Sequence, residues 1–194
     1  PSSTPYDEDG NLLGGCGLFG TNPLYEQQHS SDRNVLKRAF NTLQVTYNIW
    51  DKLNLSEKIA YDFTEGQEDV LWDRYSQNGG PGGVMQRVKN GYNTLNTQTQ
   101  LTYINDFGNH HVDALLGFET EEYNYSFNYL VGQDYPGNQY ELSLAGTTSA
   151  QSDKVTSKMT SFLGRVDYDY ADKYYAGASY RLDGSSRLAR DNRW

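Results

Sequence analysis

The sequence lacks long apolar runs, has one cysteine and is poor in basic residues, and each shortage excludes a class of protein. Nothing in its 194 residues approaches the roughly 18 consecutive apolar residues of a membrane-spanning helix, which excludes a helical membrane protein. Cys16 alone allows no internal disulfide. With 16 Lys and Arg against 25 Asp and Glu, the net charge is −9, so we expect no nucleic-acid partner.

Aromatic residues are abundant, at 14%, and tyrosine accounts for 17 of them. Tyrosine favours places where one end of its side chain is apolar and the other is wet. Such places include protein interfaces, glycan-binding surfaces and the aromatic belts of membrane β-barrels. Barrel strands alternate apolar and polar residues, so a low mean hydropathy does not exclude them.

A period of two dominates the chain from Leu36 onward. Leu43, Val45 and Tyr47, for example, alternate with Gln44 and Thr46, which gives a strand one apolar and one polar face. The pattern predicts an all-β fold, an antiparallel up-and-down meander of about six strands. We expect an irregular loop region at 1–34 and a β region at 35–194. Within the β region, the strands are expected near 36–50, 53–64, 92–105, 109–128, 155–171 and 173–183. Long loops are expected at 65–91 and 130–154.

The connections between these strands alternate between short and long. A meander then has short hairpins at one end and long loops at the other, which is the layout of outer-membrane barrels. Aromatic residues gather at the short connections, as in an interfacial girdle: Tyr47, Trp50, Tyr103, Phe107, Tyr170, Tyr174 and Tyr175. A soluble sheet with one polar face fits the alternation too. Glu57 is evidence against a barrel, because its carboxylate falls on the apolar face, which would meet lipid.

Two blocks in the last third of the chain carry a family resemblance. They are Ser161-Phe162-Leu163-Gly164-Arg165-Val166-Asp167-Tyr168 and the run 172–187, DKYYAGASYRLDGSSR, followed by Asn192-Arg193-Trp194. These blocks resemble the barrel of SusC/RagA-type TonB-dependent outer-membrane transporters, although Leu188-Ala189 replaces the family's usual Phe-Gly pair. Transporters of this class have about 22 strands, and even the smallest membrane barrels have about eight. We therefore expect an excerpt from the wall of a larger transmembrane β-barrel.

The resemblance implies a function for the parent protein. It would import large nutrients, oligosaccharides or peptides, through the outer membrane, with a SusD-like surface lipoprotein and the TonB system as partners and outer-membrane lipid around it. We expect no enzyme, because no carboxylate pair, Gly-x-Ser-x-Gly turn or Cys-His arrangement stands out. The alternative is a free-standing all-β surface module that binds a glycan or a protein.

Two sets of residues are candidates for contact with the lumen or its cargo. The tyrosine-rich end of the fourth run precedes a long loop, and aromatic faces stack on sugar rings. Its predicted cargo contacts are Tyr123, Tyr125, Phe127 and Tyr129. The polar faces of the strands predict lumen-facing residues at Asn96, Gln98, Gln100, Arg165, Asp167, Asp169, Arg181 and Asp183.

We expect neither a metal nor a cofactor. His110 and His111 are adjacent in a strand, so they point to opposite faces, and His29 lies far away in sequence. The run Asp7-Glu8-Asp9-Gly10 begins like a calcium loop but lacks the terminal bidentate Glu, which favours a simple turn.

Overall fold

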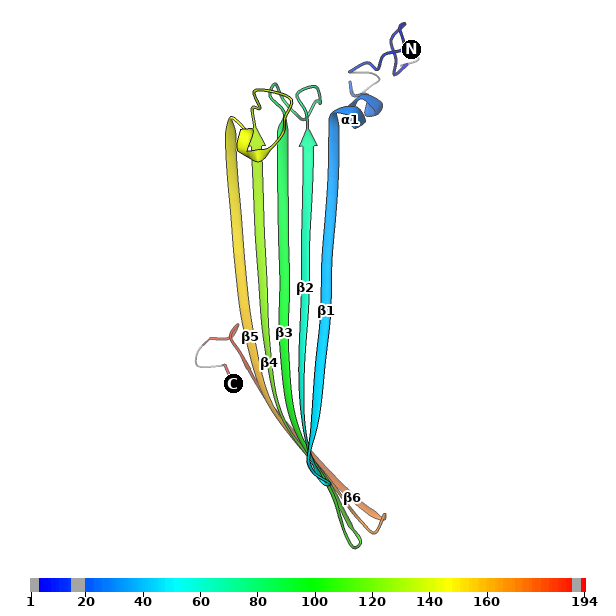
Figure 1. Ribbon diagram of the computed structural model, residues 1–194, viewed down its shortest axis with the longest axis vertical. Coiled ribbons are helices and arrows are strands. Elements are labelled where there is room, and N and C mark those ends of the chain that lie inside the picture. Colours follow the sequence, from blue (N-terminus) through cyan, green and yellow to red (C-terminus); the bar gives the residue numbers. More distant parts are fainter. Residues whose placement is uncertain (1–3, 15–19, 190–192) are drawn as a thin grey trace. The chain divides into compact units, whose positions relative to one another are not determined.

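The computed structural model describes residues 4–14, 20–189 and 193–194; Cys16 and Asn192 lie outside these ranges. Its elements are α1 (Pro23–His29), β1 (Ser30–Trp50), β2 (Leu53–Trp72), β3 (Val84–Phe107), β4 (His110–Gln133), η1 (Leu142–Leu144), β5 (Thr147–Tyr170) and β6 (Tyr174–Ser185). The six strands form one sheet in the order β1-β2-β3-β4-β5-β6, so each pairs with its neighbour in sequence (Figure 1). The predicted all-β meander of six antiparallel strands is confirmed.

Strands β2 to β5 are longer than the alternation indicates. β2 continues to Trp72 and β3 begins at Val84, so the connection is 73–83 rather than 65–91. The next long connection is likewise 134–146 rather than 130–154. Charged cross-strand pairs continue the sheet where the apolar alternation stops: Arg87 pairs with Asp69 at 2.6 Å and Lys89 with Glu65 at 3.1 Å.

The region 1–34 also contains regular structure that its composition does not predict. Helix α1 begins at Pro23, and β1 begins at Ser30. Asn22 caps the helix, because its side-chain oxygen accepts a hydrogen bond from the Leu24 amide at 3.1 Å. Asn-Pro is a helix-start signal, since proline is favoured at the first helical position.

The short connections are tight turns. Between β5 and β6, Ala171 and Asp172 have φ of 52° and 55°, and the Lys173 amide donates to the Tyr170 carbonyl at 3.1 Å. From this turn the register runs from Tyr170↔Tyr174 to Met159↔Ser185. β6 therefore lies beside only the second half of β5.

The chain divides into two compact units. The loop-end unit comprises Pro1–Lys37, Glu65–Gly91 and Ser126–Lys154, and the hairpin-end unit comprises Arg38–Thr64, Tyr92–Tyr125 and Val155–Trp194. The long connections lie in the first unit and the short turns in the second.

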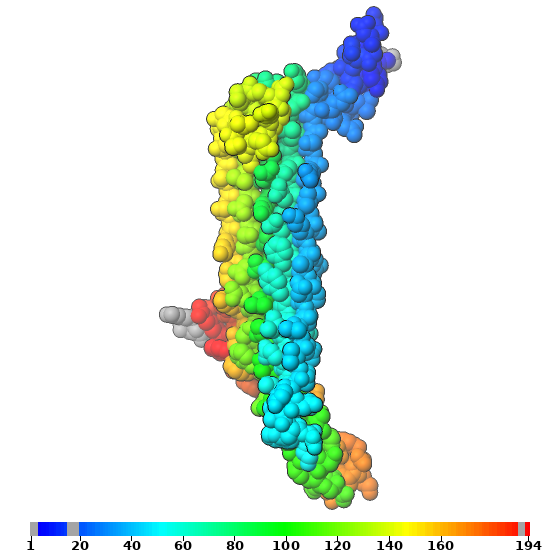
Figure 2. Space-filling model, in the orientation of Figure 1, coloured from blue at the N-terminus to red at the C-terminus, as the bar shows by residue number. Residues whose placement is uncertain are grey.

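The loop-end unit holds the buried apolar side chains of the described residues. Met85 is 8% exposed and Tyr135 is 3% exposed. Tyr135 belongs to the segment 134–146, drawn in yellow in Figure 2, which gathers into a compact mass. Its amide donates to the Gly82 carbonyl at 3.1 Å, so this segment packs on the β2–β3 connection.

The hairpin-end unit has no closed apolar core among its described residues. The side chains that alternation places on its apolar face are open to the surroundings: Leu43 is 62% exposed, Leu116 64% and Val166 49%. Val45 and Ala178 are exposed as well, and Val112 is half-buried. A free-standing soluble sandwich would bury these residues.

Candidate functional site

The polar face of the hairpin-end unit carries a network centred on Glu119 of β4. Gln98 of β3 donates to one Glu119 carboxylate oxygen at 2.7 Å, and Arg181 of β6 pairs with the other at 2.9 Å. Arg181 also pairs with Asp183 at 2.8 Å. Glu119, which the sequence did not single out, thus joins Gln98 to Arg181, and Arg181 in turn joins Asp183.

A second network on this face is centred on Arg165 of β5. Its guanidinium lies 2.9 Å from Asp167 and 3.4 Å from Asp113 of β4. Asp169 lines the same hollow as Asp113 and Asp167. Arg165 thus offsets part of a locally acidic surface.

The remaining predicted lumen-facing residues, Asn96 and Gln100, lie on β3. Asn96 lines a groove together with Gln98 and Glu119. Gln100 is half-buried and follows Gln98 in the alternation, which assigns it to the same face.

The four predicted cargo contacts fall into the two units. Tyr123 and Tyr125 belong to the hairpin-end unit, and Phe127 and Tyr129 to the loop-end unit. The Tyr125 ring lies 5.0 Å from that of Tyr92, and Arg187 lies 5.9 Å from the centre of the Tyr123 ring. Tyr92 and Arg187 are partners that the sequence did not indicate.

The other face of β4 changes from apolar to polar along its length. Leu116 and Phe118 are exposed, whereas Glu122 pairs with Lys158 at 2.8 Å and Asn124 accepts from Thr156 at 2.7 Å. This face therefore has an apolar band followed by a hydrated one, as the exterior of an outer-membrane barrel does beyond its apolar belt.

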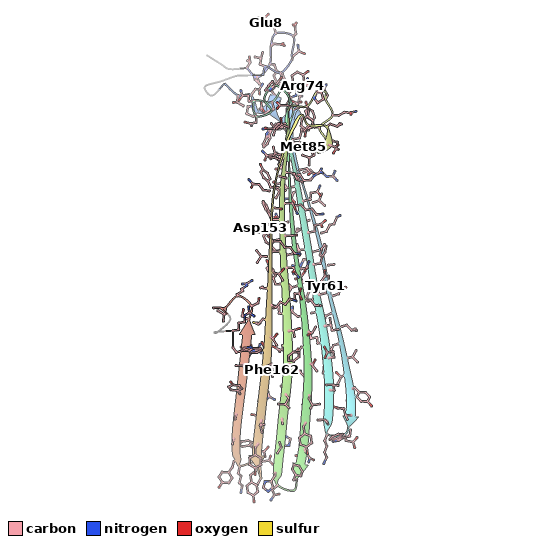
Figure 3. The ribbon with its side chains drawn as sticks, turned by 90° about the vertical axis from the view of Figure 1, so that its left-hand side faces the viewer. Glu8, Tyr61, Arg74, Met85, Asp153 and Phe162 are labelled. Carbon is pink, nitrogen blue, oxygen red and sulfur yellow. The ribbon has the colours of Figure 1, made fainter. Side chains whose placement is uncertain are left out.

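The apolar band is continuous across neighbouring strands. Phe118 of β4 and Phe162 of β5 are 5.0 Å apart, and Phe162 lies 6.1 Å from Trp194. Tyr61 of β2 and Phe162 are labelled in Figure 3, where side chains stand out from both faces of the strands. An exposed band of this kind fits an apolar partner or lipid better than water.

Exposed aromatic residues lie next to the short turns. Tyr47 is 65% exposed, Trp50 54% and Tyr174 70%. His110 bonds the Tyr168 hydroxyl at 2.6 Å, and its ring lies 4.8 Å from the tilted ring of Tyr170. Amphipathic rings at such an edge suit the boundary between apolar chains and water.

Glu57 lies on the apolar band but is not isolated there. Its carboxylate accepts a hydrogen bond from the Thr99 hydroxyl of β3 at 2.5 Å. The bond supplies a partner on the same face, which lowers the cost of a carboxyl group at this position.

In the loop-end unit, Asn22 organises the residues before β1. It is fully buried, and its side-chain amide donates to the carbonyls of Pro5 and Leu13 at 2.9 and 2.8 Å. Glu26 then binds the β2–β3 connection, accepting from the Ser76 hydroxyl at 2.6 Å and the Gln77 amide at 3.0 Å. The N-terminal segment is thereby tied to a loop some 50 residues away in sequence.

Arg74 joins the two long connections of the same unit. Its guanidinium donates to the carbonyls of Tyr135 and Gly137 at 3.0 and 2.7 Å, and its amide donates to the Tyr140 hydroxyl at 3.2 Å. Burial raises the pKa of Tyr135 above its ordinary value of 10.0. The 73–83 and 134–146 connections therefore form one bonded assembly.

The three histidines each have their own partner. His29 bonds Asp73 at 2.8 Å, His111 bonds Asp106 at 2.6 Å, and His110 bonds Tyr168. Within the described ranges, no three His, Cys, Asp or Glu side chains are grouped so as to hold a metal ion. Asp7 accepts hydrogen bonds from the amides of Asp9 and Asn11 and forms a turn. Of the described residues, no helix has both the length and the apolar character to cross a membrane.

Comparison with known proteins gives consistent relatives. No family model matches the chain. It is 25% identical over 179 residues to the TonB-dependent receptor SusC of Bacteroides thetaiotaomicron, covering 89% of this chain and 17% of that protein. It is 25% identical over 209 aligned residues to the TonB-dependent receptor P26 of Formosa agariphila, covering all of this chain and 21% of that protein. The chain thus spans about a fifth of the length of these relatives.

Solved structures share the fold. The RagAB peptide importer in its closed-closed state matches 97% of this chain with a TM-score of 0.81 and 19% identity, over 22% of the importer chain. Its open-open state matches with a TM-score of 0.78 and 20% identity, with the same coverage. The named relatives are receptors and an importer rather than enzymes.

These comparisons agree with the resemblance found in residues 161–194. The sequence relatives cover nearly the whole chain, and the fold matches one stretch of a much larger chain. In sequence and in fold, the chain resembles a partial chain of a SusC/RagA-type TonB-dependent outer-membrane transporter.

Proposed function

We propose that the chain is part of the barrel wall of an outer-membrane TonB-dependent importer that takes up oligosaccharides or peptides. The observation that carries this proposal is the exposed apolar band on one face of the hairpin-end unit, opposite a face of ion-paired polar residues. Such a sheet needs an apolar medium on one side and water on the other. Lipid of the outer membrane would cover the band, and the lumen would lie on the polar face.

The site follows from this arrangement. Residues Asn96, Gln98, Gln100, Arg165, Asp167, Asp169, Arg181 and Asp183 would face the lumen. Tyr123, Tyr125, Phe127 and Tyr129 would contact cargo, with Tyr92 extending the aromatic surface. The role is binding and passage rather than catalysis.

The partners of the parent protein follow from its family. A SusD-like surface lipoprotein would cover the end formed by the long loops, where Arg74 and Glu26 hold three segments together. The TonB system would supply the energy for import. The hydrogen bonds between the long connections support the partnership with the lipoprotein. A surface whose loops are already held in place loses less conformational freedom on binding than separate loops do.

A detergent experiment separates this proposal from a free-standing surface module. We expect the chain to be monodisperse in detergent or lipid nanodiscs and to aggregate when the detergent is removed, because the apolar band and strand edges become exposed to water. A stable monomer in plain buffer would contradict the barrel-wall proposal and favour the module.

A growth experiment tests the transport role. Cells that lack the complete gene should fail to grow on the imported nutrient as sole carbon source, and a Tyr123→Ala, Tyr125→Ala double variant should raise the nutrient concentration needed for half-maximal growth. Tyr6→Ala is the matched control, because Tyr6 is exposed in the segment before α1. Unimpaired growth of the deletion strain on every oligosaccharide and peptide tried would overturn the proposal.

A further inference from the structure

Two neighbouring hollows of about 500 and 450 Å³ lie on the apolar band of the hairpin-end unit. Leu116 and Gly164 line both hollows, which therefore form one continuous groove, called here the apolar groove. At one end the apolar groove reaches Phe162, and at the other end it reaches Val166 and Ala178. Each volume falls within the range of small-ligand sites.

Small residues leave the space for the apolar groove. Gly164 of β5 lies across from Tyr180 of β6, and Val166 lies across from Ala178. Among the described residues, a Cβ atom on Gly164 would meet only the Leu116 side chain, at 3.6 Å, which is ordinary van der Waals contact. A longer side chain at this position would extend into the groove. The glycine and the alanine between larger apolar neighbours therefore leave room for a slender apolar chain.

The strands that carry the apolar groove have their neighbours in the described sheet. β4 lies between β3 and β5, and β5 is paired with β6 from Met159 to Tyr170. A further wall strand would pair beyond β6, on the far side of the groove from β4. Glu119 and Arg181 form their ion pair on the opposite, polar face, which is the face that a domain inside a barrel would meet. The apolar groove therefore opens toward the exterior of the wall.

Polar aromatic groups lie at the end of the apolar groove nearest the short turns. Tyr168 and Tyr170 follow Val166 on the same face of β5. The Tyr168 hydroxyl bonds His110, and the Tyr170 ring lies beside the His110 ring. Such side chains suit the boundary between apolar chains and water. The groove thus has a polar end at this cluster and an apolar end at Phe162.

The length and the lining of the apolar groove fit one acyl chain. From Phe162 to Val166, β5 rises about 13 Å, and one leaflet of a bilayer has an apolar layer about 15 Å deep. Thr99 also lines the groove, and its hydroxyl is bonded to Glu57 at 2.5 Å. A protein segment would need hydrogen-bond partners for its backbone in such a place, whereas an acyl chain needs none.

We propose that the apolar groove binds one phospholipid of the leaflet that lies on the side of the short turns. One acyl chain would lie over Gly164, between Leu116 and Val166, and the glycerol and headgroup would lie beside the His110–Tyr168 pair. The inference rests on the proposed barrel-wall function. It goes beyond a general cover of lipid, because it assigns one lipid to one position on the wall.

The test counts the lipids retained by the full-length parent protein in detergent. The probe is palmitoyl-oleoyl phosphatidylethanolamine, titrated and counted by native mass spectrometry, and the comparison ligand is the dihexanoyl form, whose chains are too short to fill the groove. We expect one long-chain lipid per barrel to bind about tenfold more tightly than the dihexanoyl form. Gly164→Leu should weaken this binding about fivefold, because the new side chain occupies the groove.

Matched variants identify the groove as the cause. Gly164→Ala adds only a Cβ atom, for which there is room, and should bind the lipid as the wild type does. Ala39→Leu adds a leucine to an exposed position of β1, outside the groove, and should leave binding unchanged. Gly164→Val should weaken binding as Gly164→Leu does, and because valine favours strands it keeps the test valid if the leucine variant folds poorly.

Two results would overturn the inference. One is equal retention of the long-chain lipid by Gly164→Leu and Ala39→Leu. The other is a dimer of the parent protein that Gly164→Leu dissociates without changing lipid retention, because a second copy would then occupy the groove. Either result leaves the barrel-wall proposal intact, since that proposal is tested separately by the behaviour of the chain without detergent and by the growth of the deletion strain.

Discussion

The loop-end and hairpin-end units are made stable in opposite ways. The loop-end unit contains the buried Asn22, Met85 and Tyr135, and its polar groups bond to specific partners across long connections. The hairpin-end unit has an ion-paired polar face but leaves large apolar side chains such as Leu116 exposed. The loop-end unit buries apolar side chains against its own chain, whereas the hairpin-end unit leaves its large apolar side chains exposed to the surroundings.

The largest expected effect comes from placing a charge on the apolar band. Leu116→Lys should destabilise the protein in a bilayer by about 2–4 kcal/mol, because a lysine facing lipid near the midplane must be desolvated. Denaturant titration in lipid vesicles measures this change. Ser179→Lys, at an exposed position that is paired with Arg165 on the polar face, is the control. Equal effects at the two positions would remove the distinction between the faces.

A smaller effect is expected from Asn22→Ala in the loop-end unit. The substitution leaves the Pro5 and Leu13 carbonyls and the Leu24 amide without their partner, which should cost about 2–3 kcal/mol locally. Amide hydrogen exchange in residues 4–14 and 20–29 should rise accordingly, while exchange in β5 and β6 stays the same. Asn138→Ala, at an exposed loop position, is the control. Unchanged exchange in Asn22→Ala would show that the segment is held by other contacts.

The smallest effect on stability is expected from a substitution of Tyr135, which should not destabilise the protein. Its buried hydroxyl has no hydrogen-bond partner among the described residues, so Tyr135→Phe should be neutral or stabilise by up to about 1 kcal/mol. Burial also raises the pKa of Tyr135 in the folded protein, so the folded state holds the phenolic proton more tightly than the unfolded state. The free energy of unfolding should therefore fall as the pH rises above 10.0, the ordinary pKa of tyrosine. Below that pH, Tyr135 should have no effect on it.

Hydrogen exchange of residues 134–146 as a function of pH tests this linkage. The wild-type segment should open above about pH 10, and Tyr135→Phe should lose that pH dependence. A Tyr135→Phe protein that opens over the same pH range would assign the effect to another group.

The sequence predicted the hairpin-end unit better than the loop-end unit for a physical reason. Alternation records which face meets an apolar medium, so Leu43, Val45 and Leu116 mark their strands directly. In the loop-end unit, the Arg87–Asp69 and Lys89–Glu65 pairs hold strands together without that pattern. Strand ends in this unit therefore could not be placed from periodicity.

The polar networks were predictable only in part. Alternation assigned Gln98 and Arg181 to polar faces, but their meeting at Glu119 requires the register of three neighbouring strands. The Asn22 side chain bonds the carbonyls of Pro5 and Leu13, which lie in a separate segment. No local sequence pattern predicts such bonds.

The unequal lengths of β5 and β6 have a consequence for how the isolated chain meets other copies of itself. β6 covers β5 from Met159 to Tyr170, and the Lys158 amide and carbonyl are bonded to Ser186. The part of β5 before Lys158 offers the backbone groups along this edge to any extended segment that can reach them. Asp153 and Lys154 lie in this stretch, and because their charges alternate in sign, an antiparallel second copy could place opposite charges across from each other. This half-strand is therefore where a second copy of the isolated chain would associate by strand pairing.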